Sequence, residues 1–349
     1  MPDSPGPDVV GLGYCCLDEL LLLSEIPDPE GRALVRKRGV HGGGMVPTAM
    51  VAVAKLGGRA GFIGKVGDDE AGRHIRDELH AYGVDVARLV VQSGAASNRT
   101  IVLVDERSGA RSFLSDRGTL TAVRPAELER TYVRAAKLLH LSDASEAAVT
   151  AARWVKEGGG RVCFDGTHFH PSLWPLIPLV DYLIVSRFFA SEFAAHTAGK
   201  GEGRSAQLFA GEHGADSADS AYPSATHPEG VAAPTLAGEH LLEAARELRG
   251  HGPSVVVVTE GEHGSWCTSD EGDFHTPAFS VQPVVDTTGA GDVFHGAFLY
   301  GRSRGWGLRR SLRLAAATAA LKCRALGGRA GIPALEESLM LIDSAGIEE

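Results

Sequence analysis

The chain has 349 residues, of which 44% are hydrophobic and 22% are charged. A chain of this length and composition can bury the core of one large globular domain. Its formal net charge of −10 contrasts with the basic surface that nucleic-acid-binding proteins usually carry, so we expect no nucleic-acid partner. An acidic chain can still hold a locally positive pocket, so the charge does not exclude an anionic substrate.

Several features bear on where the protein resides. Residues 1–8 lack the basic stretch and apolar run of a secretory signal. No stretch reaches the roughly 18 consecutive apolar residues that a membrane-spanning helix needs. The five cysteines are odd in number and contain no C-x-x-C pair, which favours free thiols in a reducing compartment. We therefore expect a cytoplasmic protein with no membrane partner.

The first third of the chain combines short apolar runs with helical patterns. The apolar runs predict strands, and stretches at helical spacing that end in glycine predict helices. Two further runs, on either side of Ser108 and Gly109, have the form of a β-hairpin. The predicted strands are 9–12, 20–26, 61–66, 100–105 and 111–115, and the predicted helices are 47–56 and 70–82.

From residue 138 onward, strands alternate with helices. Most of these strands are continuous apolar runs, as expected for a parallel sheet that is buried on both faces. We expect one α/β domain over residues 1–349, with a doubly wound, mostly parallel sheet flanked by helices and a small β-sheet lid from about 12–41 and 97–116. The predicted strands are 138–141, 162–165, 182–185, 255–259 and 274–281, and the predicted helices are 146–157, 241–248, 290–302 and 308–326.

The stretch 197–236 differs from the rest of the chain. It is rich in Gly, Ala, Ser and His and has almost no hydrophobic periodicity. Such a composition is typical of a long surface insertion, and we expect it to have no catalytic role.

The strongest chemical signal is the run 285–298, V-D-T-T-G-A-G-D-V-F-H-G-A-F. A polar turn with two glycines leads directly into a helix whose early face is apolar. The backbone N–H groups of Gly289, Ala290 and Gly291 are expected at the helix N-terminus, where they can bind an anion. The small residues at these positions let a phosphate approach the backbone closely.

Asp292 follows these glycines at the start of the same helix. A carboxylate beside an anion site can accept a proton from an attacking hydroxyl group, which makes Asp292 a candidate general base. A simpler interpretation is that Asp292 caps the helix and Gly291 only forms the turn. That interpretation explains the acid, but it does not explain the two glycines and two threonines before it.

This run resembles the signature D-T-x-G-A-G-D of the ribokinase-like (PfkB) carbohydrate kinase family and matches it at every fixed position. The resemblance implies a kinase that uses ATP and Mg²⁺ to phosphorylate a small sugar-like molecule. It also implies the ribokinase-like fold, and we expect two copies to pair through the lid as a homodimer.

Two upstream blocks strengthen the resemblance. Gly42–Gly44 is similar to the glycine hinge of the family, and 63–72, I-G-K-V-G-D-D-E-A-G, is similar to its G-x-x-G-D-D-x-x-G continuation. We expect Asp68 and Asp69 to shape a surface turn rather than bind a metal. By resemblance, the substrate-binding residues are Asp18, Gly43, Gly44 and Thr48. Thr48 stands where the family usually has an asparagine, which changes the hydrogen-bonding pattern offered to the sugar. Asp18 is equally well interpreted as a solvent-facing loop residue.

Two later blocks resemble the nucleotide side of the family's site. The segment 255–264 is similar to the family's strand followed by T-x-G-x-x-G, and 327–333, G-G-R-A-G-I-P, is similar to its terminal loop. The resemblance implies that Asp286 helps to hold a monovalent cation, K⁺, in some members. The implied nucleotide-binding residues are Thr259, Gly261, Gly264 and Thr288.

The sequence also departs from the family. Residues 186–189, S-R-F-F, replace the N-x-x-E motif, and Glu192 nearby is a candidate substitute. Asp165-Gly166-Thr167 replaces D-x-N. Thr48 at the hinge together with the tail pattern G-G-x-x-G-x-P most resembles the branch that includes sulfofructose kinases. The pair His168 and His170 suggests a metal site, but no third ligand is spaced to join it, so packing or surface roles are favoured for the histidines.

Three functions are therefore compatible with the sequence. A kinase acting on a sugar, sugar acid or sugar phosphate is favoured, including fructose-like or sulfofructose-like substrates. A nucleoside kinase of the adenosine type is a second possibility, although Tyr14 and Phe113 are the few aromatic residues of the lid. A non-catalytic binding protein of the same family is a third, and the complete anion loop with Asp292 argues against it.

Overall fold

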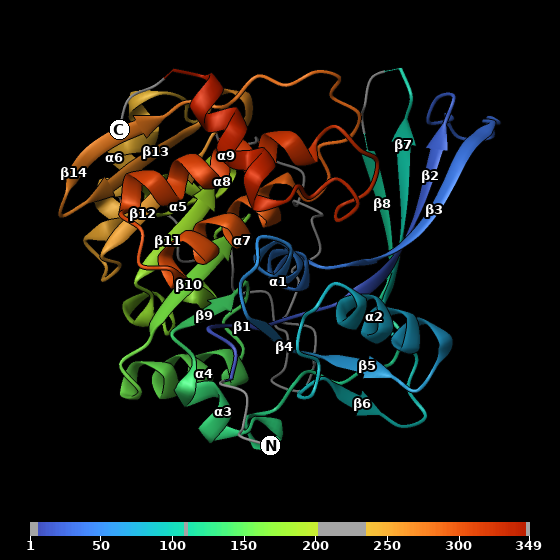
Figure 1. Cartoon of the computed structure of the whole chain (residues 1–349), viewed down its shortest axis with the longest axis horizontal. Helices are drawn as coiled ribbons and strands as arrows, with labels where there is room; N and C mark the ends of the chain where they lie inside the picture. The colour runs from blue at the N-terminus through green and yellow to red at the C-terminus, as the bar shows by residue number, and fades with distance from the viewer. Residues whose placement is uncertain (1–5, 108–110, 202–234, 347–349) are drawn as a thin grey trace.

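The computed structural model describes residues 6–107, 111–201 and 235–346. Its largest element is an eight-stranded sheet in the order β14-β13-β12-β11-β10-β9-β1-β4 (Figure 1). The pairings from β12 to β4 are parallel, whereas β13 and β14 add an antiparallel edge. The strands are β1 (Val9–Leu12), β4 (Ala60–Ile63), β9 (Leu138–Leu141), β10 (Arg161–Gly166), β11 (Tyr182–Ser186), β12 (Val255–Thr259), β13 (Ser265–Ser269) and β14 (Gly272–Thr276).

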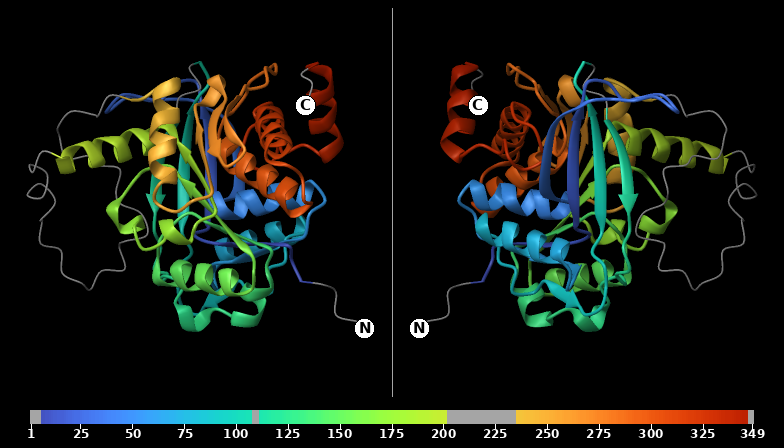
Figure 2. Two further views of the ribbon diagram at one scale, coloured as in Figure 1. Left: turned by 90° about the vertical axis from the view of Figure 1, so that its left-hand side faces the viewer. Right: turned by 90° about the vertical axis from the view of Figure 1, so that its right-hand side faces the viewer.

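Helices cover both faces of this sheet, as Figure 2 shows from the side. One face packs against α1 (Met45–Lys55), α2 (Glu70–Ala81), α7 (Ala290–Ser303), α8 (Leu308–Lys322) and α9 (Leu335–Ser344). The other face packs against α3 (Arg130–Ala135), α4 (Glu146–Glu157), α5 (Arg187–Gly201) and α6 (Glu239–Arg249). The predicted doubly wound α/β fold is therefore confirmed.

A smaller four-stranded sheet stands beside the main one in Figure 1. Its order is β3-β2-β7-β8, and the predicted hairpin is its β7–β8 pair; residues 108–110 between them lie outside the described residues. The strands are β2 (Cys16–Leu23), β3 (Val35–Gly43), β7 (Arg99–Asp105) and β8 (Arg111–Asp116). They coincide with the segments from which we expect a lid.

Helix α7 lies very close to α1. A Cβ atom added to Gly296 would come within 2.4 Å of the carbonyl oxygen of Ala49 and 2.6 Å of the Cβ of Ala52. Only glycine allows this approach, and the small residues of α1 supply the flat surface that it needs. The start of α7 is thereby held in a fixed position beside the sheet.

Several predicted boundaries were wrong, each for a local reason. Helix α8 ends at Lys322 instead of residue 326, because the carbonyl of Cys323 turns away to accept the N–H groups of Val285 and Asp286. Strand β14 ends at Thr276 because Pro277 has no N–H group to donate. The predicted strand 61–66 is two strands, β4 and β5 (Lys65–Gly67), and β5 pairs with β6 (Val90–Gln92).

The antiparallel strand β13 is absent from the sequence-based prediction. The expected insertion 197–236 falls mostly on 202–234, which lie outside the described residues. Its first residues continue α5 as far as Gly201, and Leu236 packs partly buried against the core, so the described ends of this stretch belong to the domain.

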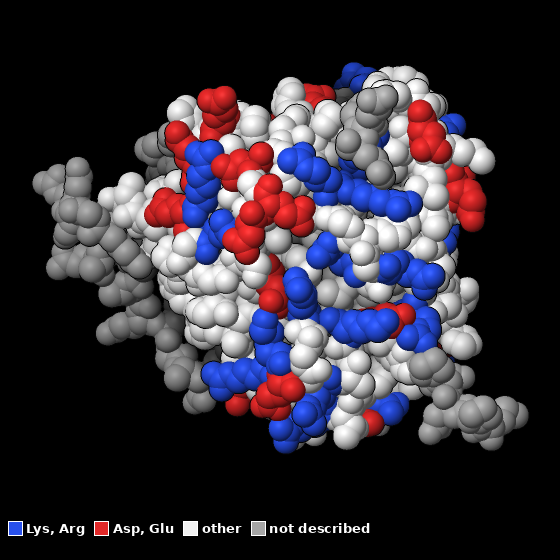
Figure 3. All heavy atoms as spheres, turned by 60° about the vertical axis from the view of Figure 1, so that its left-hand side comes forward, with Lys and Arg blue, Asp and Glu red and all other residues white. Residues whose placement is uncertain are grey.

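Acidic and basic side chains lie next to one another on the face drawn in Figure 3. Ion pairs on the described surface include Arg246–Asp273 at 2.6 Å and Arg130–Glu157 at 2.7 Å. Exposed pairs of this kind contribute only about 0–1 kcal/mol each to stability. Among the described helices, none is long and apolar enough to cross a membrane.

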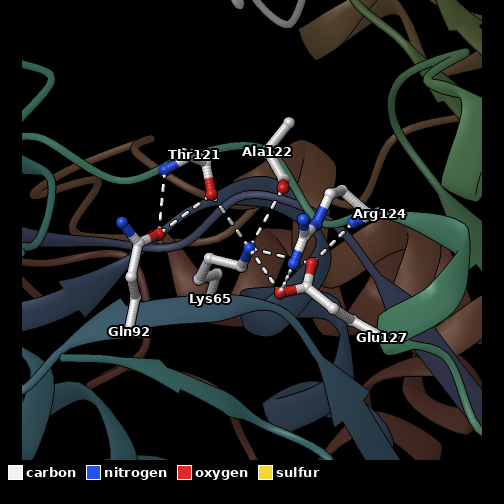
Figure 4. Close-up of polar contacts among 6 residues, drawn as sticks. All are labelled: Lys65, Gln92, Thr121, Ala122, Arg124 and Glu127. Atoms are coloured by element: carbon white, nitrogen blue, oxygen red, sulfur yellow. Dashed lines mark hydrogen bonds and ion pairs between the residues drawn. The ribbon is translucent and has the colours of Figure 1, made fainter.

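A partly buried ion pair anchors the second glycine block. The ammonium group of Lys65 donates to the Oγ1 of Thr121, to the carbonyl of Ala122 and to both carboxylate oxygens of Glu127 (Figure 4). Burial alone would raise the pKa of Glu127, but Lys65 and the N–H of Arg124 lower this pKa to about 2. Lys65 thus joins β5 to the connection that leads into the second half of the sheet.

Candidate active site

The predicted anion site is the beginning of α7. Gly289 precedes the helix with φ at +75°, and an added Cβ would lie 2.9 Å from the carbonyl oxygen of Gly328. The N–H of Ala290 donates to the carbonyl of Thr287 at 3.2 Å, so it is not free, contrary to our expectation. Within the described chain, the N–H groups of Gly289, Gly291 and Asp292 donate to no protein atom. These three groups remain available to an anion.

Asp292 lies in the first turn of α7 and is partly open to solvent. The pKa of its carboxyl group is raised to about 7, first by desolvation and second by the neighbouring carboxylate of Asp165. The neighbouring side chains of His295, Arg329 and Lys322 act in the opposite direction. A carboxyl group with a pKa near neutrality can exchange a proton with a substrate hydroxyl at physiological pH.

Asp165 ties β10 to α7. One of its carboxylate oxygens lies 3.3 Å from Nε2 of His295, and both side chains are buried. Burial alone would raise the pKa of Asp165, but the charge and hydrogen bond of His295 leave it lowered. Asp165 pairs in register with Ile184 of β11 near the carboxyl end of the sheet, so the start of α7 lies at that edge. Ligands bind at this edge in doubly wound folds.

Asp286 is a buried junction between two loops. Its carboxylate accepts hydrogen bonds from the N–H and the Oγ1 of Thr288, at 2.8 Å and 2.7 Å, and from the N–H of Gly327 at 2.8 Å. The ammonium of fully buried Lys322 donates to the main-chain oxygen of Asp286 at 2.8 Å. Burial alone would raise the pKa of Asp286, but the hydrogen bonds keep it lowered.

One arginine of the smaller sheet reaches this junction. Arg111, the first residue of β8, donates from Nη1 to the Oγ1 of Thr288 at 2.9 Å, and the same nitrogen lies 3.9 Å from Asp286. Its side chain keeps 29% of its surface exposed, so it has room to bind a further group. A positive charge therefore stands beside the free N–H groups of α7.

The substrate-side residues Asp18 and Gly43 lie together. A Cβ added to Gly43 would overlap the carboxylate of Asp18, at 2.2 Å from Oδ2. Asp18 accepts a hydrogen bond from the thiol of Cys16 at 3.1 Å, and burial raises its pKa. Gly44 has φ at +100°, which begins α1 in a conformation that favours glycine. The interpretation of Asp18 as a solvent-facing loop residue is wrong, because it lies half-buried in β2.

Thr48 has a supporting position. It is buried in α1, and its Oγ1 accepts a hydrogen bond from Nε of Arg329 at 3.2 Å. The same guanidinium donates to Glu78 at 2.6 Å and to the carbonyl of Gly43 at 3.0 Å. Glu78 in turn accepts the N–H of Gly42 at 2.7 Å. Arg329 therefore joins the tail loop, α1 and α2 to the glycine hinge, and its charge acts on both Asp18 and Asp292.

The predicted nucleotide-side residues follow β12 at the same edge of the sheet. Thr259 ends this strand and pairs in register with Ser186 of β11. Gly261 and Gly264 have φ at +61° and +90°, and a Cβ on Gly264 would come within 2.2 Å of the carbonyl of Thr276. Buried Glu260 stabilises this turn, because its carboxylate accepts a hydrogen bond from the indole N–H of Trp266 at 3.2 Å.

The segments that depart from the family have structural partners. The Oγ of Ser186 accepts the N–H groups of Phe188 and Phe189 and so caps α5. Glu192 does not stand free as a metal ligand: its oxygens bind Nδ1 of His168 and the N–H of Phe169, both at 2.8 Å. Each of these residues stabilises a loop at the edge of the sheet.

Sequence reasoning missed four residues that the site brings together: Arg111, Glu78, Arg329 and Lys322. Arg329 could have been found as the one charged residue of G-G-R-A-G-I-P. The other three carry no local signal, because their partners are between 36 and 251 residues away.

Known proteins resemble this chain over most of its length. The model of the pfkB family carbohydrate kinases matches residues 7–217 and 223–335. The 5-dehydro-2-deoxygluconokinase of Shouchella clausii is 27% identical over 346 residues, covering 96% of this chain and 95% of that protein. The aminoimidazole riboside kinase of Salmonella typhimurium is 32% identical over 272 residues, covering 75% and 74%.

Among solved structures, the ribokinase of Arabidopsis thaliana complexed with ribose and ATP has a TM-score of 0.76 at 21% identity. The superposition covers 97% of this chain and 99% of that one and shows that the two share a fold. The fold and site define a ribokinase-like phosphotransferase. The chain belongs to the pfkB family of carbohydrate kinases, as its signature predicted.

Proposed function

We propose that the protein transfers the γ-phosphoryl group of ATP to a hydroxyl of a small sugar, sugar acid or sugar phosphate. One observation carries this proposal: Asp292, with a pKa raised to about 7, lies beside the unpaired N–H groups that begin α7. A base and an anion site at one point are what phosphoryl transfer to a hydroxyl requires.

In the proposed step, the substrate oxygen attacks the γ-phosphorus while its proton passes to Asp292. The new O–P bond forms as the bond between the γ-phosphorus and the β–γ bridging oxygen breaks, and ADP leaves with that oxygen. The N–H groups of Gly289 and Gly291 and the guanidinium of Arg111 stabilise the charge on the transferred phosphoryl oxygens.

The residues present fit a nucleotide whose base and ribose lie at Thr259–Gly264 and whose phosphates point to α7. When bound, Mg²⁺ neutralises phosphate charge. Among the described carboxylates, Asp286 and Glu192 are already engaged by protein donors. Mg²⁺ would therefore be held mainly by the nucleotide phosphates and water rather than by these two carboxylates, a usual arrangement for this ion.

Asp18 and the backbone at Gly43 and Gly44 are proposed to bind the substrate hydroxyls. Thr48 acts through Arg329, which it helps to hold, so its effect on substrate choice is indirect. The similarity to a 5-dehydro-2-deoxygluconokinase favours a sugar acid or related sugar. The similarity to an aminoimidazole riboside kinase, with Phe113 exposed on β8, supports a riboside as the second candidate.

The smaller sheet is proposed to act as the lid and to pair with a second copy. Large apolar side chains are exposed on or beside it, with 37–59% of their surface accessible. Exposed apolar side chains on one small sheet are typical of a protein interface. The residues are Leu34, Val35, Val40, Ile101, Phe113 and Leu114. A cytoplasmic location remains a prediction of the sequence.

A K⁺ site at Asp286 also remains a prediction, and two observations weigh against it. The carboxylate already accepts three hydrogen bonds, and the ammonium of Lys322 supplies a positive charge at the main-chain oxygen of the same residue. We therefore propose that Lys322 takes the place of a monovalent cation.

A substrate panel tests the proposed function. ADP formation is followed with ATP and Mg²⁺ in the presence of sugars, sugar acids, sugar phosphates and nucleosides. We expect turnover with at least one sugar or sugar acid and stabilisation by that compound in a thermal shift assay. Turnover confined to nucleosides would support the riboside alternative, and binding without turnover would support a non-catalytic family member.

A further inference from the structure

Below the candidate active site, three buried side chains direct metal-binding atoms toward one point. His140 of β9, Cys163 of β10 and His295 of α7 each offer one ligand atom, and these atoms all lie within 4.8 Å of one another. The three side chains are 0–4% exposed. They come from three elements that are distant in sequence, so the cluster is a product of the fold.

Strand register and helix packing create the cluster. His140 and Cys163 are paired neighbours on adjacent parallel strands, so their side chains lie side by side on one face of the sheet. Helix α7 packs against that face and brings His295 to a ring-centroid distance of 5.3 Å from His140.

The imidazoles are buried without the partners that buried polar groups normally have. In the described part of the chain, neither ring nitrogen of His140 has a hydrogen-bond partner, and Nδ1 of His295 has none. Buried nitrogens of this kind are uncommon, because the lost hydrogen bonds to water are not replaced. A histidine that served only to pack the core would be better replaced by an apolar residue. A ligand is therefore the more economical explanation of the orphaned nitrogens.

The surroundings also suit a metal ligand set. Asp165 lies 3.3 Å from Nε2 of His295, the contact by which a carboxylate commonly fixes the ring of a metal-binding histidine. Two imidazoles and a thiolate are typical of a zinc-type ion, which prefers nitrogen and sulfur ligands. In a tetrahedral zinc site the ligand atoms lie roughly 3.3–3.8 Å apart, so small side-chain shifts close the cluster around the ion.

We propose that His140, Cys163 and His295 form a buried structural site for a thiophilic transition-metal ion such as Zn²⁺. Binding releases the thiol proton of Cys163 to solvent and leaves a thiolate–metal bond; no electron transfer is involved. The ion joins β9 and β10 to α7 one turn after Asp292, so it secures the helix that carries the catalytic base. This site is distinct from the proposed Mg²⁺–nucleotide site and does not depend on it.

The test supplies the metal while the chain folds. The full-length protein is produced in zinc-supplemented and in cobalt-supplemented medium, and the purified chains are passed through a weak chelator. We expect about one ion per chain. The cobalt form should show a thiolate-to-cobalt charge-transfer band and the visible bands of a four-coordinate site. Loading should also raise the melting temperature.

Substitutions then locate the site. Cys163→Ser and His140→Gln should each remove the bound ion and the charge-transfer band. Cys267→Ser is the matched control, because Cys267 is an equally buried thiol that belongs to no such cluster in the described chain. It should retain both. A second control, the double variant His168→Ala and His170→Ala, removes two exposed histidines that are close in sequence and should leave the ion in place.

Several outcomes would overturn the site. A wild-type chain that holds far less than one ion, or a cobalt form without a thiolate band, excludes it, and this result needs no variant to fold. Retention of the ion by Cys163→Ser, or its loss in the His168/His170 double variant, would place the metal elsewhere. Phosphoryl transfer with ATP and Mg²⁺ by a chain that holds no zinc would overturn the structural site only if the chain were also as stable as the zinc-loaded form. The proposed kinase function would stand in either case, so the two proposals can fail separately.

Discussion

Two glycine- and aspartate-rich segments of this chain look alike in sequence and differ in what their polar groups do. In 63–72, Asp69 accepts the N–H of Gly72 at 2.8 Å and both donors of Ser97, and Asp68 accepts the N–H of Gly94. In 286–292, the carboxylate of Asp292 has no hydrogen bond among the described residues, and the N–H groups of Gly289, Gly291 and Asp292 are unpaired there. The aspartates of the first segment have hydrogen-bond partners within the protein. In the second segment, the carboxylate of Asp292 and three N–H groups are left available to a ligand.

The second segment repeats this contrast within itself. Asp286 is fully engaged by Thr288 and Gly327 and has a lowered pKa, whereas Asp292 has a raised one. The spacing of a motif therefore does not reveal which aspartate takes part in catalysis and which has a structural role. Hydrogen-bond satisfaction separates them, because a group that already has partners cannot also act on a substrate.

The largest effect is expected from Asp292→Asn. An amide cannot accept the hydroxyl proton, so kcat should fall by at least ~10² while nucleotide affinity remains near normal. The matched control is Asp69→Asn, which alters an aspartate with three structural hydrogen bonds. It should lower stability by about 1–2 kcal/mol and leave kcat nearly unchanged. Steady-state kinetics and thermal melts on both variants test whether Asp292 is catalytic and Asp69 structural. Equal losses of kcat in the two variants would contradict this difference in roles.

The next effect is expected from Arg111→Met. Loss of the guanidinium beside Thr288 removes charge stabilisation from the transferred phosphoryl group, and kcat should fall by roughly 10- to 100-fold. Arg107→Met is the control, since Arg107 follows the end of β7 and pairs with Glu25 at the surface. Full activity in Arg111→Met, measured at saturating ATP, would assign Arg111 to loop packing alone.

A stability effect without a catalytic one is expected from Lys65→Met. The change removes the hydrogen bonds of Lys65 from the partly buried carboxylate of Glu127 and leaves Arg124 as its partner, at a cost of about 1–3 kcal/mol in the free energy of unfolding. The pKa of Glu127 is lowered in the folded state, so the pair contributes fully above the ordinary value of 4.5 and its contribution is lost as the pH falls toward about 2. Urea unfolding of both proteins at neutral and acidic pH measures this. A wild-type chain no less stable at acidic pH would disprove the linkage.

The smallest effect is expected from the monovalent cation. Because Lys322 already places an ammonium against the main-chain oxygen of Asp286, replacing K⁺ by choline should change kcat by less than about two-fold. Initial rates at constant ionic strength provide the measurement. A strict requirement for K⁺ would restore Asp286 as part of a cation site.

The fold class and part of the candidate site could be predicted from the sequence. The strands of the parallel sheet are apolar runs, and the main helices begin and end at readable signals, so the fold class followed directly. The anion turn and Asp292 also carry a local pattern. The antiparallel β13 was missed because its short alternating run is compatible with a loop, and the end of α8 because its cause is a contact with Asp286.

The parts of the site that could not be predicted depend on distant contacts. Arg329 reaches Glu78 and Thr48 across more than 200 residues, and Arg111 reaches Thr288 across 177. The sequence favoured packing or surface roles for the histidines, because no third ligand is spaced to join His168 and His170. His140, Cys163 and His295 are far apart along the chain and did not stand out as a ligand set. Their convergence depends on strand register and on where α7 crosses the sheet.

The pH dependence of single-turnover phosphoryl transfer tests the role of Asp292 most directly. The base must be deprotonated to accept the hydroxyl proton, and its pKa is raised to about 7. The rate should therefore rise with pH through about 7 and then level off, with the slope of one ionisation. A rate that stays constant from about pH 5.5 to about 8.5 would contradict the assignment of Asp292 as the general base.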